Sequence, residues 1–223
     1  MPCPRCRGPL EGFPPQARFC FRCLQRLELP PRGLRGGAPL PFPWWAAGSY
    51  AGALRSMLLD LKRRPRPSVV DALLAGRGNA PAPGGQAGDT VLTPIPGWKR
   101  GSNALPAVMA MRLARHQGWR QANLLELRHP VLGQHRLHRR LREANQREAF
   151  RCREGPAGGK RAVILLDDIL TSGATLRSAA AALAAAGWQV RGAVCLARTP
   201  RPARDAADRD LGSMGRCRDG EPG

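Results

Sequence analysis

The stretch "VILLDDILTSGATL", from Val163 to Leu176, decides the fold of this chain. Its apolar run reads as a buried strand, which ends in two adjacent acids and is followed by a turn and an alanine-rich helical run. In an open α/β sheet the ligand crevice lies beyond the carboxyl ends of the strands. We therefore expect Asp167 and Asp168 to lie at the edge of such a crevice.

The turn after the two acids predicts an anion site. At a helix start, unpaired backbone N–H groups, the helix dipole and the hydroxyls of Thr171, Ser172 and Thr175 can all face one anion. Gly173 allows the backbone to come close. A phosphate fits this turn, whereas the neighbouring carboxylates bind hydroxyls or a metal, so a sugar phosphate satisfies both. The alternative is that Thr171 or Ser172 only caps the helix and that both acids are solvated.

Strand and helix patterns alternate along the rest of the chain. Leu54, Leu58 and Leu61 recur at helical spacing, and Gly118 closes a later helical run. This alternation predicts an α/β fold with a parallel sheet and helices on both faces. The predicted helices cover residues 50–64, 68–74, 104–118 and 174–187, and the predicted strands begin at 90, 124, 161 and 189. A mobile loop is expected at 76–89, and a disordered tail from 199.

Four cysteines near the N-terminus have metal-ligand spacing. The pattern is Cys3-x2-Cys6, thirteen intervening residues, then Cys20-x2-Cys23. Two such pairs provide the tetrahedral thiolate set that zinc prefers, and four thiolates indicate a structural ion because no position stays open. Disulfides, which a reducing compartment disfavours, and a rubredoxin-type iron centre are the alternatives. The segment up to residue 43 has too few apolar residues for its own core, so metal binding would order it.

The charge of the chain favours a polyanionic partner. A net charge of +20 and a pI near 11.5 attract polyanions such as nucleic acid, although an arginine-rich composition throughout the source would produce the same values. The chain has no apolar run near the ~20 residues that span a bilayer, and its N-terminus lacks the apolar core of a signal peptide. We expect a cytoplasmic protein without a membrane span.

A basic segment from Arg128 to Arg153 contains the candidate nucleic-acid ligands. On a helix, four of its arginines would lie along one face and follow a phosphate backbone; they are Arg136, Arg139, Arg140 and Arg147. The alternative is a solvated basic helix. Four tryptophans would either stack on single-stranded bases or lie in the core; they are Trp44, Trp45, Trp98 and Trp119.

The stretch "VILLDDILTSGAT" resembles the 5-phosphoribosyl-1-diphosphate (PRPP) motif of type I phosphoribosyltransferases. The resemblance implies that Asp167 and Asp168, the candidate catalytic residues, hold the ribose hydroxyls. It also implies that the 5-phosphate is wrapped by the turn Thr171, Ser172, Gly173, Ala174 and Thr175. "PIPGWKR" at 94–100 resembles the loop that holds the pyrophosphate, with Lys99 and Arg100 supplying positive charge that a bound Mg2+ shares.

The combination of a four-cysteine zinc ribbon and such a domain resembles the ComF family of bacterial competence proteins. "YAGALR" at 50–55 with Lys62 and "PIP" at 94–96 match further family features, whereas "RGSNA" at 100–104 lacks the aromatic and the amide of the usual Arg-Gly-Phe-Asn-Gln. The implied organisation is a zinc ribbon at 1–43, a phosphoribosyltransferase-like domain at 44–198 and a tail at 199–223.

The family resemblance also implies a function. A ComF-like protein would assist uptake or handling of transforming single-stranded DNA, with PRPP and other competence-machinery proteins as further partners. The alternative is an active phosphoribosyltransferase of nucleotide metabolism or salvage. Ribosyl transfer passes through an oxocarbenium-like state, which needs a fixed ribose and a stabilised leaving pyrophosphate. The sequence identifies no acceptor pocket for such a reaction.

Overall fold

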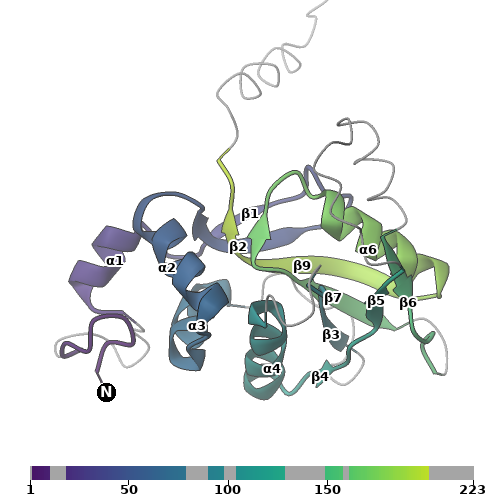
Figure 1. The fold of residues 1–223 in the computed structure, drawn as a ribbon, viewed down its shortest axis with the longest axis horizontal. Coiled ribbons are helices and arrows are strands. Elements are labelled where there is room, and N and C mark those ends of the chain that lie inside the picture. Colours follow the sequence, from purple (N-terminus) through teal and green to yellow (C-terminus); the bar gives the residue numbers. More distant parts are fainter. Residues whose placement is uncertain are drawn as a thin grey trace, which may run out of the picture.

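A computed structural model of the chain describes residues 2–10, 19–78, 90–97, 104–128, 149–157 and 161–200. Within these residues a seven-stranded sheet has the order β1-β2-β9-β7-β3-β4, with β8 beside β9 (Figure 1). All its strand pairs are parallel except β1 with β2. The strands are β1 Leu34–Gly36, β2 Trp44–Ser49, β3 Thr90–Pro94, β4 Arg120–Gln121, β7 Ala162–Leu166, β8 Ile169–Leu170 and β9 Gln189–Arg198. The predicted α/β class with a mostly parallel sheet is confirmed.

Helices cover both faces of this sheet. One face carries α2, α3 and α4, and the other carries α6 (Figure 1). The helices are α2 Gly52–Arg63, α3 Pro67–Leu74, α4 Leu105–Gln117 and α6 Ala174–Ala185. Because side chains alternate along a strand, Ile164 and Leu166 of β7 pack beneath α2, α3 and α4, whereas Val163 and Leu165 pack beneath α6. An unbroken apolar strand is therefore required at this position.

The strand order reverses between β3 and β7. From β3 the chain continues through α4 to β4 on one side, whereas from β7 it continues through α6 to β9 on the other side. β3 and β7 pair in register from Thr90 opposite Ala162 to Pro94 opposite Leu166. The segments that follow them therefore leave the sheet side by side. In open α/β sheets this position is where ligands bind.

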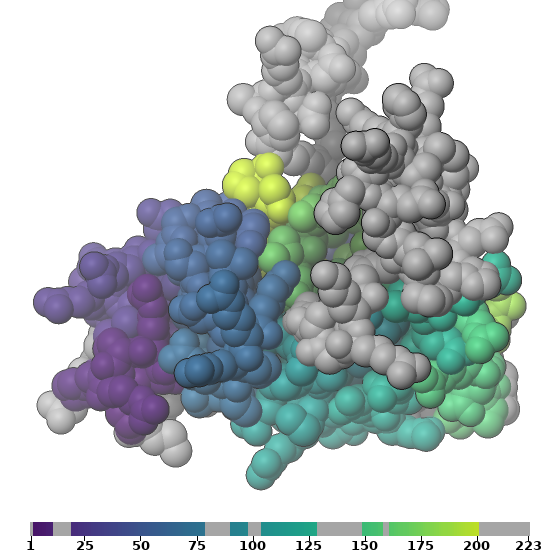
Figure 2. Space-filling view, in the orientation of Figure 1, coloured from purple at the N-terminus to yellow at the C-terminus, as the bar shows by residue number. Residues whose placement is uncertain are grey.

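The N-terminal segment shares the core of the main domain. Its helix α1, Phe21–Leu27, contacts α2, and Figure 2 shows the segment packed against the α2 and α3 region. Buried residues of the segment belong to the same hydrophobic cluster as Leu58 of α2; they are Cys3, Phe19, Cys23 and Leu27. The predicted boundary at residue 43 falls between β1 and β2, which pair with each other. Apolar contacts with α2 therefore help to hold the N-terminal segment in place, in addition to the stabilisation that metal binding would provide.

Several predicted elements are confirmed. The helices at 52–63, 67–74 and 105–117 form where their periodicity places them, and Gly118, at φ 67°, closes α4. The strand predicted at 124–127 forms as β5, Leu125–Leu127, but it pairs with β6, Phe150–Cys152, in a separate antiparallel sheet. The predicted loop at 76–89 begins within the short 3-10 helix η1, Ala75–Arg77, and most of it lies outside the described residues. The tail beyond residue 200 lies outside them too.

Strand β2 was not predicted. Its sequence, "WWAAGS", is a short apolar run without alternation, and such a run does not distinguish a strand from other buried structure. Trp44 and Trp45 face opposite sides of the sheet with 8% and 0% of their surface exposed, and Trp119 is also buried. Base stacking is therefore wrong for these three tryptophans, and they are core residues. Trp98 lies outside the described residues.

No helix in the described part of the chain combines the length and the apolar character that a membrane crossing requires.

Candidate functional site

The two acids lie directly after β7, at the point where the strand order reverses. The backbone N–H of Asp167 donates to the carbonyl of Val194, and the carbonyl of Asp168 accepts from the N–H groups of Leu196 and Ala197. These bonds fix the acids against β9, the neighbouring strand. Asp168 is buried, with 6% of its surface exposed, whereas Asp167 is half-buried.

The charges around this acid pair are strongly coupled. Lys62, in the last turn of α2, places its Nζ 3.0 Å from Oδ2 of Asp168. The backbone N–H of Asp168 donates to Oδ1 of Asp167 at 2.9 Å. Burial, together with the negative charge of Asp168, raises the pKa of Asp167 to about 7. Asp167 therefore takes up a proton at a higher pH than an isolated carboxyl does.

The turn at residues 171–175, called the phosphate loop below, opens α6 as predicted. Gly173 is at φ 76°, a conformation that favours glycine, and Oγ of Ser172 accepts from the N–H of Ala174 at 3.4 Å. Thr171 and Ser172 are exposed, whereas Gly173 is buried, and Ala174 and Thr175 are half-buried. The hydroxyls of the first two residues are accordingly accessible to a ligand.

Two arginines that the sequence analysis did not single out hold this loop. Arg177 donates to the carbonyls of Ser172 at 2.9 Å and Pro39 at 3.0 Å. Arg198 donates to the carbonyls of Leu170 at 2.9 Å and of Thr171. A positive charge in the first turn of a helix is unfavourable beside the helix dipole unless an anion or a carbonyl group balances it. The position of Arg177 in the sequence could therefore have predicted such a partner. The contact of Arg198 with the loop could be predicted only from the strand order, because it depends on β9 ending beside β7.

The turn after β3 lies next to the acid pair. The backbone N–H of Ile95 donates to the carbonyl of Leu166, the residue before Asp167. Tyr50, directly after β2, donates its backbone N–H to the carbonyl of Arg198, so the end of β2 belongs to the same edge of the sheet. The predicted pyrophosphate ligands Lys99 and Arg100 lie outside the described residues.

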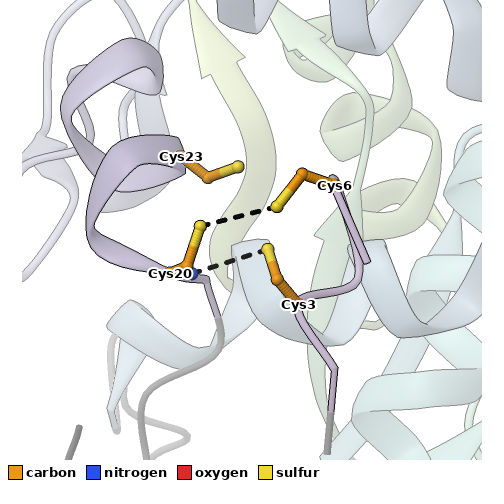
Figure 3. A group of neighbouring side chains, drawn as sticks. All are labelled: Cys3, Cys6, Cys20 and Cys23. Carbon is orange, nitrogen blue, oxygen red and sulfur yellow. Dashed lines mark hydrogen bonds between the residues drawn. The ribbon is translucent and has the colours of Figure 1, made fainter. Parts of the chain in front are cut away.

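The four N-terminal cysteines converge on one point. Their Sγ atoms all lie within 4.8 Å of one another, and those of Cys6 and Cys20 are 3.6 Å apart (Figure 3). A tetrahedral zinc with Zn–S bonds of about 2.3 Å places its sulfurs roughly 3.8 Å apart, so the cysteines fit this ion. The predicted four-cysteine module is thus present.

Backbone donors prepare one of these thiols for metal binding. Burial alone raises the pKa of Cys3, but N–H groups of Cys20, Cys6 and Arg5 outweigh this effect and lower the pKa to about 6. The N–H of Cys20 lies 3.5 Å from the Cys3 sulfur. Burial, with hydrogen bonds among the thiols, raises the pKa of Cys23 to about 12. A cation at the centre would favour all four thiolates.

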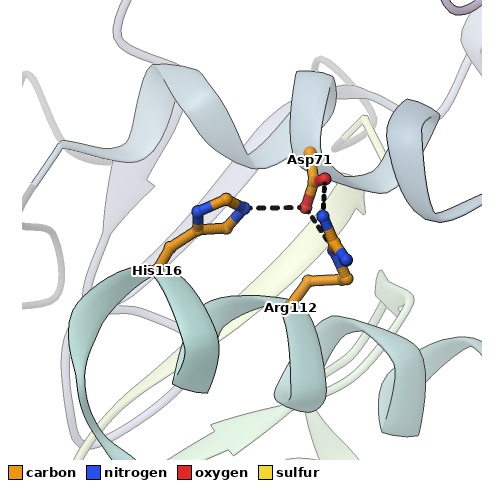
Figure 4. A network of polar contacts seen from close by, with 3 residues as sticks. All are labelled: Asp71, Arg112 and His116. Atoms are coloured by element: carbon orange, nitrogen blue, oxygen red, sulfur yellow. Dashed lines mark hydrogen bonds and ion pairs between the residues drawn. The ribbon is translucent and has the colours of Figure 1, made fainter.

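A second polar cluster joins α3 to α4 (Figure 4). Arg112 donates from Nε to Oδ1 of Asp71 at 2.8 Å and from Nη2 to Oδ2, and Nε2 of His116 lies 3.1 Å from Oδ1. Burial tends to raise the pKa of Asp71, but the hydrogen bonds from Arg112 and His116 lower it below its usual value. The bidentate pair holds two helices together on one face of the sheet, which indicates a structural role.

The predicted nucleic-acid ligands are four arginines of the basic segment. All four lie outside the described residues; they are Arg136, Arg139, Arg140 and Arg147.

Two solved structures resemble the chain weakly. One is an adenine phosphoribosyltransferase from Leishmania tarentolae, with 19% identity, a TM-score of 0.41 and coverage of 82% of this chain and 88% of that one. The other is the adenine phosphoribosyltransferase from Leishmania donovani, with 16% identity, a TM-score of 0.40 and coverage of 81% and 80%. At these TM-scores the likeness assigns no role to any residue. No family model and no curated protein matches the chain.

Proposed function

We propose that the chain binds PRPP where β3 and β7 end, through a type I phosphoribosyltransferase-like domain of the ComF kind. One observation carries this proposal. Asp167, Asp168 and a glycine-containing turn follow β7 at the point where the strand order reverses. They lie beside the turn that follows β3, the strand paired with β7. The domain would span residues 44–198, between a zinc ribbon at 1–43 and a tail at 199–223.

Each part of the site suits a different part of the ligand. The phosphate loop offers hydroxyls and a helix N-terminus to the 5-phosphate. Asp167 and Asp168 accept hydrogen bonds from the ribose hydroxyls, and Lys62 balances the charge of Asp168 across 3.0 Å. Lys99 and Arg100, which lie outside the described residues, would supply positive charge to the pyrophosphate. The carboxylate oxygens suit Mg2+, which would supply further positive charge to the pyrophosphate.

The proposed biological role is handling of transforming single-stranded DNA in the cytoplasm, together with other competence proteins. The net charge of +20 supports a polyanionic partner. A phosphoribosyltransferase of nucleotide metabolism or salvage is the second candidate, favoured by the acid pair after β7. A nucleobase that accelerates pyrophosphate release from PRPP would favour this second role.

Release of pyrophosphate from PRPP tests whether the site is catalytic. Asp168→Asn is expected to lower the rate at least about 100-fold, because an amide would replace the carboxylate that is proposed to hold the ribose hydroxyls in position. Asp60→Asn removes an equal charge from an exposed position on α2 and serves as the control. An Asp168→Asn protein that melts as the wild type does and releases pyrophosphate at the same rate would contradict a catalytic role.

A further inference from the structure

A basic hollow lies where α2 ends and α3 begins. It has a volume of about 480 Å³, and its lining among the described residues is Asp60, Arg63, Arg64 and Arg66. All four residues are exposed. We call this feature the arginine hollow. None of these four described lining residues is assigned above to PRPP or to the metal.

Helix geometry explains why these side chains gather there. Asp60, Arg63 and Arg64 are spaced i, i+3 and i+4, so they share one face near the end of α2. Pro65 cannot continue the helix, and Arg66 occupies the N-cap position of α3 without a side-chain capping bond, which brings a third arginine to the same place. The sequence "RRPR" therefore places three arginines at the junction of α2 and α3, where they line one hollow.

The arginine hollow faces away from the proposed ribose site. Lys62, which reaches Asp168, lies about 200° around the helix from Asp60 at 3.6 residues per turn. Leu61, between them in sequence, is buried against the core. A ligand in the hollow and a ligand beside Asp168 would thus contact different sides of α2, and both could bind at once.

The charge of the hollow defines its ligand. Among the described lining residues, three guanidinium groups against one carboxylate give a net charge of +2. Guanidinium groups offer planar pairs of donors that match phosphate oxygens, and they stay charged at any physiological pH. An exposed hollow suits a polymer that passes through it. Because the carboxylate of Asp60 repels an anion, Asp60→Asn should strengthen binding. A basic surface that binds no ligand would not show this effect.

We propose that the arginine hollow binds the phosphate backbone of single-stranded nucleic acid, simultaneously with PRPP at the ribose site. This inference rests on the DNA-handling part of the proposed function. Its test is the fluorescence anisotropy of a labelled oligothymidylate, titrated with full-length protein between about 50 and 200 mM salt. The variant is Arg63→Ala/Arg64→Ala/Arg66→Ala. Its charge-matched control is Arg115→Ala/Arg120→Ala/Arg191→Ala, at exposed positions on α4, β4 and β9.

Loss of three phosphate contacts should make the slope of log affinity against log salt less negative by about 2 in the hollow variant, since each contact contributes roughly 0.7 for a single strand. The control should change the slope less, Asp60→Asn should bind more tightly, and PRPP should bind the hollow variant as it binds the wild type. If the wild type binds the oligonucleotide and both triple variants show the same slope, nucleic-acid binding by the arginine hollow would be contradicted, but the DNA-handling role would not. A wild type that fails to bind DNA even at low salt would overturn the DNA-handling role as well.

Discussion

Gly173 shows how much a single residue constrains the phosphate loop. At its φ of 76°, a side chain is strained, and an added Cβ would lie 2.7 Å from Cδ2 of Leu40 and 3.2 Å from Cγ of Pro39. Gly173→Ala should therefore lower the free energy of unfolding by at least about 1–2 kcal/mol and weaken PRPP binding. Denaturant unfolding and a PRPP titration measure the two effects. Gly37→Ala, at a position where an added Cβ meets no atom within 4 Å, is the matched control and should change neither quantity. Unchanged stability and affinity in Gly173→Ala would contradict the assigned conformation.

At the same scale, the sequence located the acids and the loop because they form one contiguous motif. The contacts of Lys62, Arg177 and Arg198 come from positions that are remote along the chain or on a different strand. Only the strand order brings Arg198 to the end of β7. Sequence patterns therefore predict where a ligand would bind, but not which side chains support that position.

The contact between α3 and α4 depends on Asp71, and its strength should depend on pH. Because the folded pKa of Asp71 is lowered from 3.8, the pair with Arg112 stabilises the fold above pH 3.8 and loses this effect as the pH falls through the folded pKa. Arg112→Met should cost about 1.5–3 kcal/mol at pH 7 and progressively less below pH 3.8. Urea unfolding across this range measures the difference. Arg115→Met, on the exposed side of the same helix, is the control, and a cost for Arg112→Met that is independent of pH would exclude the pair as its source.

Helix elements were predictable from periodicity, and strands only in part. α2 and α4 have clear helical spacing, and Gly118 ends α4. β2 is a six-residue strand whose two tryptophans fill opposite faces, which no local pattern reveals. The sequence predicted the strand β5, but it did not predict the pairing of β5 with β6, because these two segments are distant in the sequence. Such pairings depend on tertiary structure and not on local preference.

Across the whole molecule, the four-cysteine module and the proposed ribose site share one helix. Cys3 and Cys23 belong to the same hydrophobic cluster as Leu58 and Leu61 of α2, and Lys62 at the end of that helix pairs with Asp168. Removal of a metal bound by these cysteines should therefore loosen α2 and disturb the charge balance at the acids. The sequence indicated the cysteine ligands, but it did not indicate that their module completes the main core.

Metal removal tests this connection. Purified protein should contain one zinc per chain, and Cys6→Ser should lower the free energy of unfolding by at least about 3 kcal/mol, because a structural zinc contributes ~10 kcal/mol or more to folding. PRPP affinity should fall in the same variant. Cys152→Ser, at a half-buried cysteine outside the cluster, is the matched control. A metal-free protein with unchanged stability and unchanged PRPP affinity would contradict both the zinc assignment and the link through α2.

The most direct measurement is a calorimetric titration of the full chain with PRPP in the presence of Mg2+, alongside Asp167→Asn/Asp168→Asn. Both proteins are first compared by thermal unfolding, so that a folding defect is recognised. We predict saturable binding at one site per wild-type chain and an affinity about 100-fold lower or worse in the variant, because the ribose hydroxyls lose both carboxyl acceptors. Absence of binding by the wild type, or equal affinity in the folded variant, would contradict a pentose phosphate site at the end of β7.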